Sequence, residues 1–214
     1  MGTLAVGRVR VAELDAVTLD AYGTLVTLID PVPALAAALA ARGVEREVEL
    51  VRHGFRTEAA YYREHASAGY DENTLTQLRA NCAGVFLGAV EADLDAQEFG
   101  PVYADAMHFE LLPGIVESLE RLRALGLELA IVGNWDVSLR DRLDEVGLTR
   151  YFTTLVHAAG KPAPDGLLQA LERLHVPPQR ALHIGDDDVD EEAARAAGMR
   201  FARAPVADAV AALT

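Results

Sequence analysis

The second half of the chain alternates between short apolar runs and amphipathic segments, and this alternation constrains the fold more than any other feature. Glycines follow several of the amphipathic segments, as is common where helices end. Strands that alternate with helices through short links form a mainly parallel sheet with helices on both faces, so the sequence predicts an α/β, Rossmann-like fold. The expected strands lie near residues 127–132, 154–156, 181–184 and 199–202, and the expected helices near residues 115–125, 137–146, 163–174 and 190–197.

One more strand is expected much earlier, over residues 14–19, and a long helical block separates it from the others. Between residues 31 and 108 apolar residues recur at spacings of three and four, and we find no convincing strand. The sequence therefore predicts a core of residues 1–30 and 109–214 that is interrupted by an all-helical cap domain over residues 31–108. The first residues form either a short edge strand around Val9 or a loose tail.

Composition narrows the classes of function. With 214 residues, 51% of them hydrophobic, the chain can bury a sizeable core. Its formal net charge of -14 repels polyanions, which argues against nucleic acid or an anionic membrane as a partner. A single cysteine, Cys82, excludes an internal disulfide, and no apolar run has membrane-spanning length. We expect a cytoplasmic protein, and its oligomeric state stays open.

Polar residues follow several of the expected strands. Asp20 follows the first strand, Gly133 and Asn134 follow another, and Asp186 follows a third, while Lys161 lies in a proline-rich loop before a helix. Because the carboxyl ends of parallel strands meet at one edge of a sheet, we expect these residues to converge.

The acidic run at residues 186–190 suggests a metal site. Like charges this close need a cation to hold them together, and hard oxygen ligands suit Mg²⁺. The alternative is a solvated turn in which Asp190 caps the following helix.

In their order and spacing these motifs resemble the haloacid dehalogenase superfamily of aspartate-nucleophile hydrolases. The resemblance spans nearly the whole chain. It implies that the helical block is a mobile cap that closes over the site and selects the substrate. The matching motifs are Asp20-x-Tyr22-Gly23-Thr24-Leu25, the strand end at Asn134, Lys161-Pro162-x-Pro164, and Gly185-Asp186-x-x-x-Asp190.

The resemblance also implies a role for each motif residue. Asp20 would attack phosphorus, or carbon in the dehalogenating branch, and Lys161 would keep Asp20 ionised and offset charge on the transferred group. Asn134 would donate an amide hydrogen to the substrate. Thr24 would brace the nucleophile loop or serve as a simple turn hydroxyl. The Mg²⁺ ligands would be Asp20, Asp186 and the main-chain carbonyl of Tyr22, with Asp187 or Asp190 bound directly or one layer further out.

Two positions depart from the family pattern. Phosphatases of the family usually carry a second aspartate, a general acid and base, where this chain has Tyr22. Tyrosine there resembles the metal-independent 2-haloacid dehalogenases, whose halide leaving group needs no proton. The family usually has serine or threonine at Gly133, so the backbone N–H and Asn134 remain to bind the phosphoryl group. The acidic run at 186–188 favours phosphate, because those dehalogenases carry a serine and asparagine pattern there.

Three functions follow from these features. The favoured one is a Mg²⁺-dependent phosphatase that acts on a small phosphorylated metabolite through an aspartyl-phosphate intermediate. The second is a 2-haloacid dehalogenase, with Arg56 of the cap as a candidate partner for the substrate carboxylate. The third is a regulatory module that keeps a metal and anion pocket without turnover, since Tyr22 and Gly133 both depart from the usual machinery. The cap helices carry no motif that names the substrate.

Overall fold

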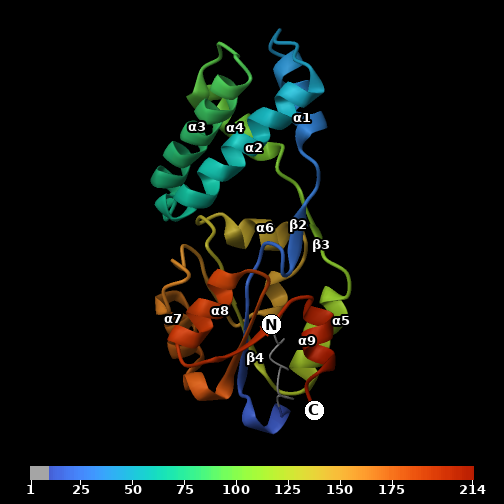
Figure 1. Ribbon diagram of the computed structural model, residues 1–214, viewed down its shortest axis with the longest axis vertical. Coiled ribbons are helices and arrows are strands. Elements are labelled where there is room, and N and C mark those ends of the chain that lie inside the picture. The colour runs from blue at the N-terminus through green and yellow to red at the C-terminus, as the bar shows by residue number, and fades with distance from the viewer. Residues whose placement is uncertain (1–9) are drawn as a thin grey trace, which may run out of the picture. The chain divides into compact units, whose positions relative to one another are not determined.

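The computed structural model describes residues 10–214, so the possible edge strand around Val9 lies outside the described residues. These residues divide into two compact units (Figure 1). One unit holds the described residues up to Thr27, Leu111–Asn134 and Leu139–Thr214, and the other holds Leu28–Glu110 and Trp135–Ser138. The divisions near residues 27 and 110 differ by a few residues from the expected ones at 30 and 109, and the short segment after Asn134 groups with the helical unit.

Five parallel strands form the sheet of the first unit, in the order β5-β4-β1-β6-β7. The two central neighbours β1 and β6 are buried along their whole length, as expected for a parallel sheet covered on both faces. The Rossmann-like fold predicted from the alternating pattern is confirmed. The strands are β1 (Ala16–Leu19), β4 (Glu128–Val132), β5 (Thr154–Val156), β6 (Ala181–Gly185) and β7 (Arg200–Arg203).

Helices cover this sheet on both faces (Figure 1). Helices α7 and α8 pack on one face, where alanines of β1, β4 and β6 meet Leu167 and Leu171 of α7 and Ala193 of α8. Helices α5 and α9 pack together on the other face. The helices of this unit are α5 (Ile115–Ala124), α6 (Leu139–Glu145), α7 (Asp165–Leu174), α8 (Asp188–Ala196) and α9 (Val206–Ala211).

Strand register decides which side chains face α7 and α8. Thr18 of β1 pairs directly with His183 of β6. Successive side chains of a strand alternate between faces, so Thr18 and Asp20 share the face of Ala16, which packs against these helices. Polar groups therefore line this face toward the carboxyl ends of the central strands.

The second unit is the predicted helical block. Its core surrounds Phe86, which is fully buried and packs against Phe99 and Tyr103 with ring centroids 6.1 and 5.0 Å away. Among residues 10–214 we find no helix whose length and apolar character would let it cross a bilayer. The helices are α1 (Val32–Ala40), α2 (Val48–His65), α3 (Glu72–Ala89) and α4 (Ala96–Asp105).

Sequence patterns gave no sign of the two short strands that flank this block. Strands β2 (Val26–Leu28) and β3 (Phe109–Leu111) pair in a separate two-stranded sheet where the chain enters and leaves the block. Each is only three residues long, too short for an alternating pattern to stand out.

A buried carboxylate lies inside the helical unit. Glu58 of α2 is 5% exposed, and the Tyr103 hydroxyl donates to its Oε2 atom at 2.6 Å. Burial raises the pKa of Glu58 above its usual 4.5, although hydrogen bonds from Tyr103 and Cys82 oppose the increase. The folded state therefore favours the protonated form of Glu58 more than the unfolded state does.

This linkage predicts a pH-dependent effect of Glu58→Gln. Glu58 contributes stability below pH 4.5, and that contribution is lost as the pH rises through the higher pKa of the folded state. The free energy of unfolding of Glu58→Gln relative to the unmodified protein should therefore increase as the pH rises above 4.5. Urea unfolding at a series of pH values measures this difference, with Glu64→Gln on the exposed face of α2 as the control. A difference that does not change with pH would contradict the assignment.

Candidate active site

The loop after β1 holds Asp20 at the carboxyl edge of the sheet. The Asp20 N–H donates to the Ile184 carbonyl of β6 at 2.9 Å, which continues the sheet pairing one residue past the strand. The N–H groups of Leu25 and Val26 both donate to the Ala21 carbonyl, so the chain turns back immediately.

Gly23 makes this turn possible and brings the acidic loop close. Its φ is +81°, a backbone conformation that favours glycine. A Cβ atom at this position would lie 2.3 Å from Oδ2 of Asp186. The Thr24 hydroxyl donates to Oδ1 of the same Asp186 at 2.9 Å, so Thr24 ties the nucleophile loop to the acidic loop.

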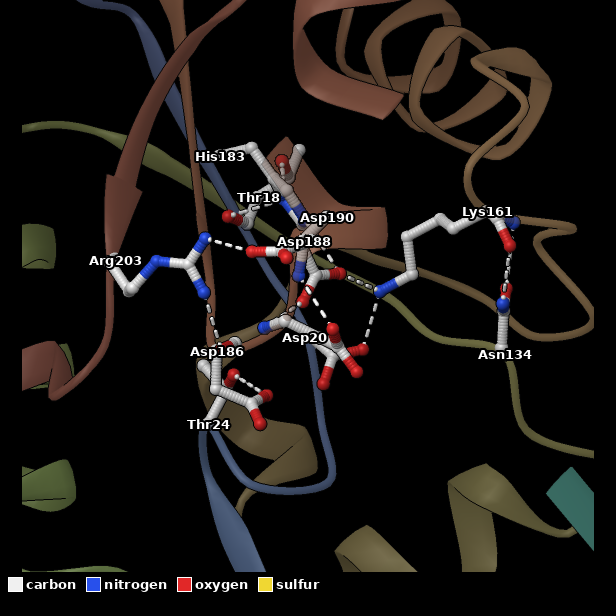
Figure 2. Close-up of polar contacts among 11 residues, drawn as sticks. Thr18, Asp20, Thr24, Asn134, Lys161, His183, Asp186, Asp188, Asp190 and Arg203 are labelled. Atoms are coloured by element: carbon white, nitrogen blue, oxygen red, sulfur yellow. Dashed lines mark hydrogen bonds and ion pairs between the residues drawn. The ribbon is translucent and has the colours of Figure 1, made fainter. Parts of the chain in front are cut away.

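Lys161 lies buried between two carboxylates (Figure 2). Its Nζ atom is 2.5 Å from Oδ1 of Asp20 and 2.5 Å from Oδ1 of Asp190, and its side chain is only 2% exposed. A buried ammonium is stable only when it is paired and hydrogen-bonded, and here both conditions are met. The sequence placed Lys161 and Asp20 at the same edge, and the structure brings them into contact.

The charges of these groups depend on one another. Burial raises the pKa of Asp20 to about 6, with Asp190 adding to the increase and Lys161 opposing it. Burial alone would also raise the pKa of Asp190, but hydrogen bonds from His183 and Lys161 and the positive charge of Lys161 hold it well below its usual value. The two carboxylates keep the pKa of Lys161 above its usual value despite burial. Asp20 is therefore mainly ionised at neutral pH, as the nucleophile role implied by its motif requires.

Three carboxylates gather where a cation could bind. Asp20, Asp186 and Asp190 each offer an oxygen, and these oxygens lie within 4.8 Å of one another. An all-oxygen donor set of this kind suits a hard divalent ion. Asp190 already accepts hydrogen bonds at Oδ1 from Lys161 and at Oδ2 from the Asp187 N–H, so Asp20 and Asp186 are better placed as direct ligands.

Asp187 has a different place from the other carboxylates. Its side chain accepts a hydrogen bond from the Asp188 N–H at 2.6 Å and caps the N-terminus of α8. The helix consequently begins at Asp188, two residues earlier than expected, and Asp187 takes the capping position that the sequence alternative gave to Asp190. Asp187 is not one of the three gathered carboxylates.

Asn134 and Gly133 make contacts other than those we expected. The Asn134 amide donates from Nδ2 to the Lys161 carbonyl and accepts at Oδ1 from the Lys161 N–H, both at 2.8 Å, so it fastens the lysine loop. The Gly133 N–H donates to the Val156 carbonyl at 3.0 Å within the sheet. The Gly133 N–H is thus used within the sheet, and one of the two Asn134 amide hydrogens is used to hold the lysine loop.

A Cβ atom at Gly133, where the family usually has serine or threonine, would fit. A Cβ atom there would be 3.5 Å from its nearest neighbour and 3.8 Å from Oδ1 of Asp20, which are ordinary contacts.

Two other residues singled out from the sequence are exposed. Tyr22, two residues after Asp20, is 51% exposed. Arg56 is exposed on α2 of the helical unit.

Arg203 is a residue of this site that our sequence reasoning missed. At the end of β7 its guanidinium donates to the Asp186 carbonyl and to the Asp188 carboxylate, both at 2.8 Å (Figure 2). It offsets part of the negative charge of the acidic loop and holds that loop to the sheet. The available signal was its place directly after the last expected strand, at the edge where the other polar residues converge.

An aspartate and a buried lysine thus meet at the ends of parallel strands, beside an acidic helix start, as the motifs of the aspartate-nucleophile hydrolases led us to expect. Residues 14–198 match the sequence model of the haloacid dehalogenase-like hydrolases. The chain belongs to this family and is an enzyme, which confirms the resemblance seen in its motifs.

Individual relatives cover most of the chain. It is 31% identical over 202 residues to the human haloacid dehalogenase-like hydrolase domain-containing protein 3, covering 87% of this chain and 80% of that protein. It is 32% identical over 187 residues to phosphoglycolate phosphatase 1 of Pseudomonas aeruginosa, covering 82% and 65%. The solved L-2-haloacid dehalogenase of Xanthobacter autotrophicus is similar at a TM-score of 0.64 and 26% identity, covering 89% and 77%. The similar proteins thus include a phosphatase and a dehalogenase.

The close approach of Gly23 to Asp186 predicts different outcomes for two alanine substitutions. Gly23→Ala and Gly198→Ala both place a side chain at positive φ, which costs about 1–2 kcal/mol of folding free energy. Only Gly23→Ala also pushes against the Asp186 carboxylate, because nothing lies within 4 Å of a Cβ atom at Gly198. Gly23→Ala should lose most of its activity toward p-nitrophenyl phosphate, and Gly198→Ala should keep it, as measured at a temperature where both are folded. Equal activities would show that this approach is dispensable.

Proposed function

We propose that this enzyme is a Mg²⁺-dependent phosphatase that acts on a small phosphorylated metabolite through an aspartyl-phosphate at Asp20. The observation that supports it most is the contact of Lys161 with Asp20 at 2.5 Å beside two further carboxylates. Asp20 alone would repel an anionic substrate. The buried ammonium and a bound cation together neutralise the local negative charge, so that a phosphate can approach.

The reaction has two steps. An oxygen of Asp20 attacks phosphorus, the bond from phosphorus to the leaving oxygen breaks, and that oxygen keeps the electron pair. Water then attacks phosphorus, gives up a proton to solvent, and releases inorganic phosphate and the Asp20 carboxylate. Lys161 offsets the charge on the transferred group in both steps. Since Tyr22 stands where the family usually has its acid, the leaving oxygen takes its proton from solvent.

The residues at this edge fit a magnesium ion. Asp20, Asp186 and the main-chain carbonyl of Tyr22 would hold it, and Asp190 would support the site through its contact with Lys161. When bound, Mg²⁺ neutralises charge on the phosphate and on the gathered carboxylates. Arg203 and Thr24 keep Asp186 in place for this role.

A small substrate is favoured over a polymer. The formal net charge of -14 repels nucleic acid, while a small anion needs only a local positive group. The similarity to phosphoglycolate phosphatase supports a phosphorylated metabolite as the substrate class. The helical unit would act as the cap that selects among such metabolites.

Dehalogenation of a 2-haloacid is the second candidate. Tyr22 and the similarity to the Xanthobacter autotrophicus enzyme favour it. Asp20 would then attack carbon and expel halide, which leaves without a proton and without a metal. Asp186 weighs against this candidate, because a carboxylate next to the nucleophile has no purpose in that reaction and repels the haloacid carboxylate.

The metal assignment predicts a thermal shift. Magnesium chloride should raise the melting temperature of the protein by mass action, since the ion binds the folded state. Asp186→Asn should abolish the shift. Asp188→Asn, which changes an exposed carboxylate on the same loop, should retain it, because Asp188 is outside the gathered group. Absence of a shift at millimolar magnesium in the unmodified protein would remove the main support for the metal.

Because Tyr22 replaces the usual general acid, the rate of hydrolysis should depend strongly on the leaving group of the ester. A phosphatase without a general acid should hydrolyse p-nitrophenyl phosphate far faster than an alkyl phosphate, because nitrophenolate leaves with little protonation. Tyr22→Asp should narrow this gap, since general acid catalysis typically contributes about 10²- to 10⁴-fold. The measurement is kcat/KM for both esters in both proteins.

The same assay, extended to 2-haloacids, distinguishes the three candidate functions. Asp20→Asn should abolish hydrolysis of both esters, and activity that survives this substitution belongs to a contaminant. Halide release from 2-haloacids without magnesium would identify a dehalogenase instead. Neither activity, together with retained magnesium binding, would identify the regulatory module.

A further inference from the structure

A polar pair lies buried beneath the charged groups of the site (Figure 2). Thr18 and His183 are both 0% exposed and face each other across β1 and β6. The Thr18 hydroxyl is 2.8 Å from Nδ1 of His183, and Nε2 of the same ring is 3.5 Å from Oδ1 of Asp190. A continuous chain of contacts therefore runs from Thr18 through His183 and Asp190 to Lys161, and from there to Asp20.

The surroundings of His183 determine its tautomer. Burial lowers the pKa of His183 below its usual 6.5, which favours the neutral ring at neutral pH. With the hydrogen on Nε2, the ring donates to Asp190 and accepts the Thr18 hydroxyl at Nδ1. The other tautomer would donate from Nδ1 toward the Thr18 carbonyl at 3.2 Å and turn a bare nitrogen toward a carboxylate, which is repulsive. The contact with Asp190 therefore selects the tautomer with the hydrogen on Nε2, and in that form the Thr18 hydroxyl can donate to Nδ1.

Packing does not require a polar pair at this depth. On the same face of the sheet, the cluster under α7 and α8 is apolar, with alanines at positions 16, 130 and 181. Buried polar groups cost free energy unless they are hydrogen-bonded, and an apolar pair would avoid that cost. The polar pair of Thr18 and His183 lies at the part of β1 and β6 that is next to Asp190. This location indicates a role in the site.

We propose that His183 is a positioning residue for the hydrolase reaction. It contacts Asp190 Oδ1, which also accepts from Lys161, while the Asp187 N–H donates to Oδ2 at 3.1 Å. Contacts on both oxygens restrain the rotation of the Asp190 carboxylate, and this carboxylate in turn keeps the Lys161 ammonium directed at Asp20. The proposal rests on the proposed function in that Asp20 and Lys161 carry the chemistry.

The test compares His183→Leu with His183→Gln. His183→Leu should lower kcat for p-nitrophenyl phosphate by about 10-fold to 100-fold with little change in KM, because the reacting groups lose alignment while substrate contacts remain. His183→Gln should recover part of the loss, since its amide can donate to Asp190. Thr18→Val should lower kcat in the same direction, and it should add little in the His183→Leu background.

A structural control separates positioning from stability. Leu182→Val removes buried volume from the same strand on its opposite face, so it should lower the melting temperature and leave kcat unchanged. If His183→Leu lowers only the melting temperature and leaves kcat unchanged as well, the proposal is overturned.

A second readout does not require activity. The buried Lys161 ammonium should give a slowly exchanging ¹H–¹⁵N NMR signal, which disappears in Lys161→Met. In His183→Leu this signal should broaden or shift, and in Leu182→Val it should not. A signal unchanged in His183→Leu would overturn the proposal. An unmodified protein that hydrolyses no ester while the NMR response is present would instead refute the proposed function alone.

Discussion

The buried ammonium of Lys161 between Asp20 and Asp190 is the interaction on which the catalytic edge of this protein depends. Removing one partner from a buried ion pair typically costs about 3–5 kcal/mol, so these groups are stable only as a set. Other residues at this edge hold these three groups in place. Asn134 fastens the lysine loop, and Gly185 leaves room for Asp190, which would lie 2.4 Å from a Cβ atom at that position.

The charge of the site connects its structure to its chemistry. Three gathered carboxylates and one ammonium leave two negative charges, and one divalent cation would balance them. The same cation and Lys161 would then offset the charge of an incoming phosphate. Burial and the neighbouring Asp190 raise the pKa of Asp20 to about 6, which makes this carboxylate more basic than that of an ordinary aspartate and leaves it mainly ionised at neutral pH. The arrangement suits attack on phosphorus, which needs a basic carboxylate whose charge is shielded from the substrate.

The sequence predicted the parts of this site that depend on strand ends, because parallel strands bring their carboxyl ends to one edge whatever their spacing along the chain. Asp20, Lys161 and Asp186 meet there for that reason. Contacts between distant side chains were not predictable in the same way. Neither the two hydrogen bonds between Asn134 and Lys161 nor the pairing of Thr18 with His183 leaves a local pattern. Strands β2 and β3 were missed because three residues show no periodicity.

The central claim is that Asp20 becomes covalently phosphorylated during turnover. The most direct measurement is to mix the enzyme with p-nitrophenyl phosphate and magnesium, quench with acid within the first turnover, and reduce the product with borohydride, which converts an aspartyl phosphate to homoserine. Peptide mass spectrometry should then find homoserine at position 20 and aspartate at positions 186 and 190. Unmodified Asp20 in an enzyme that has released nitrophenol, or homoserine at another position, would contradict the account.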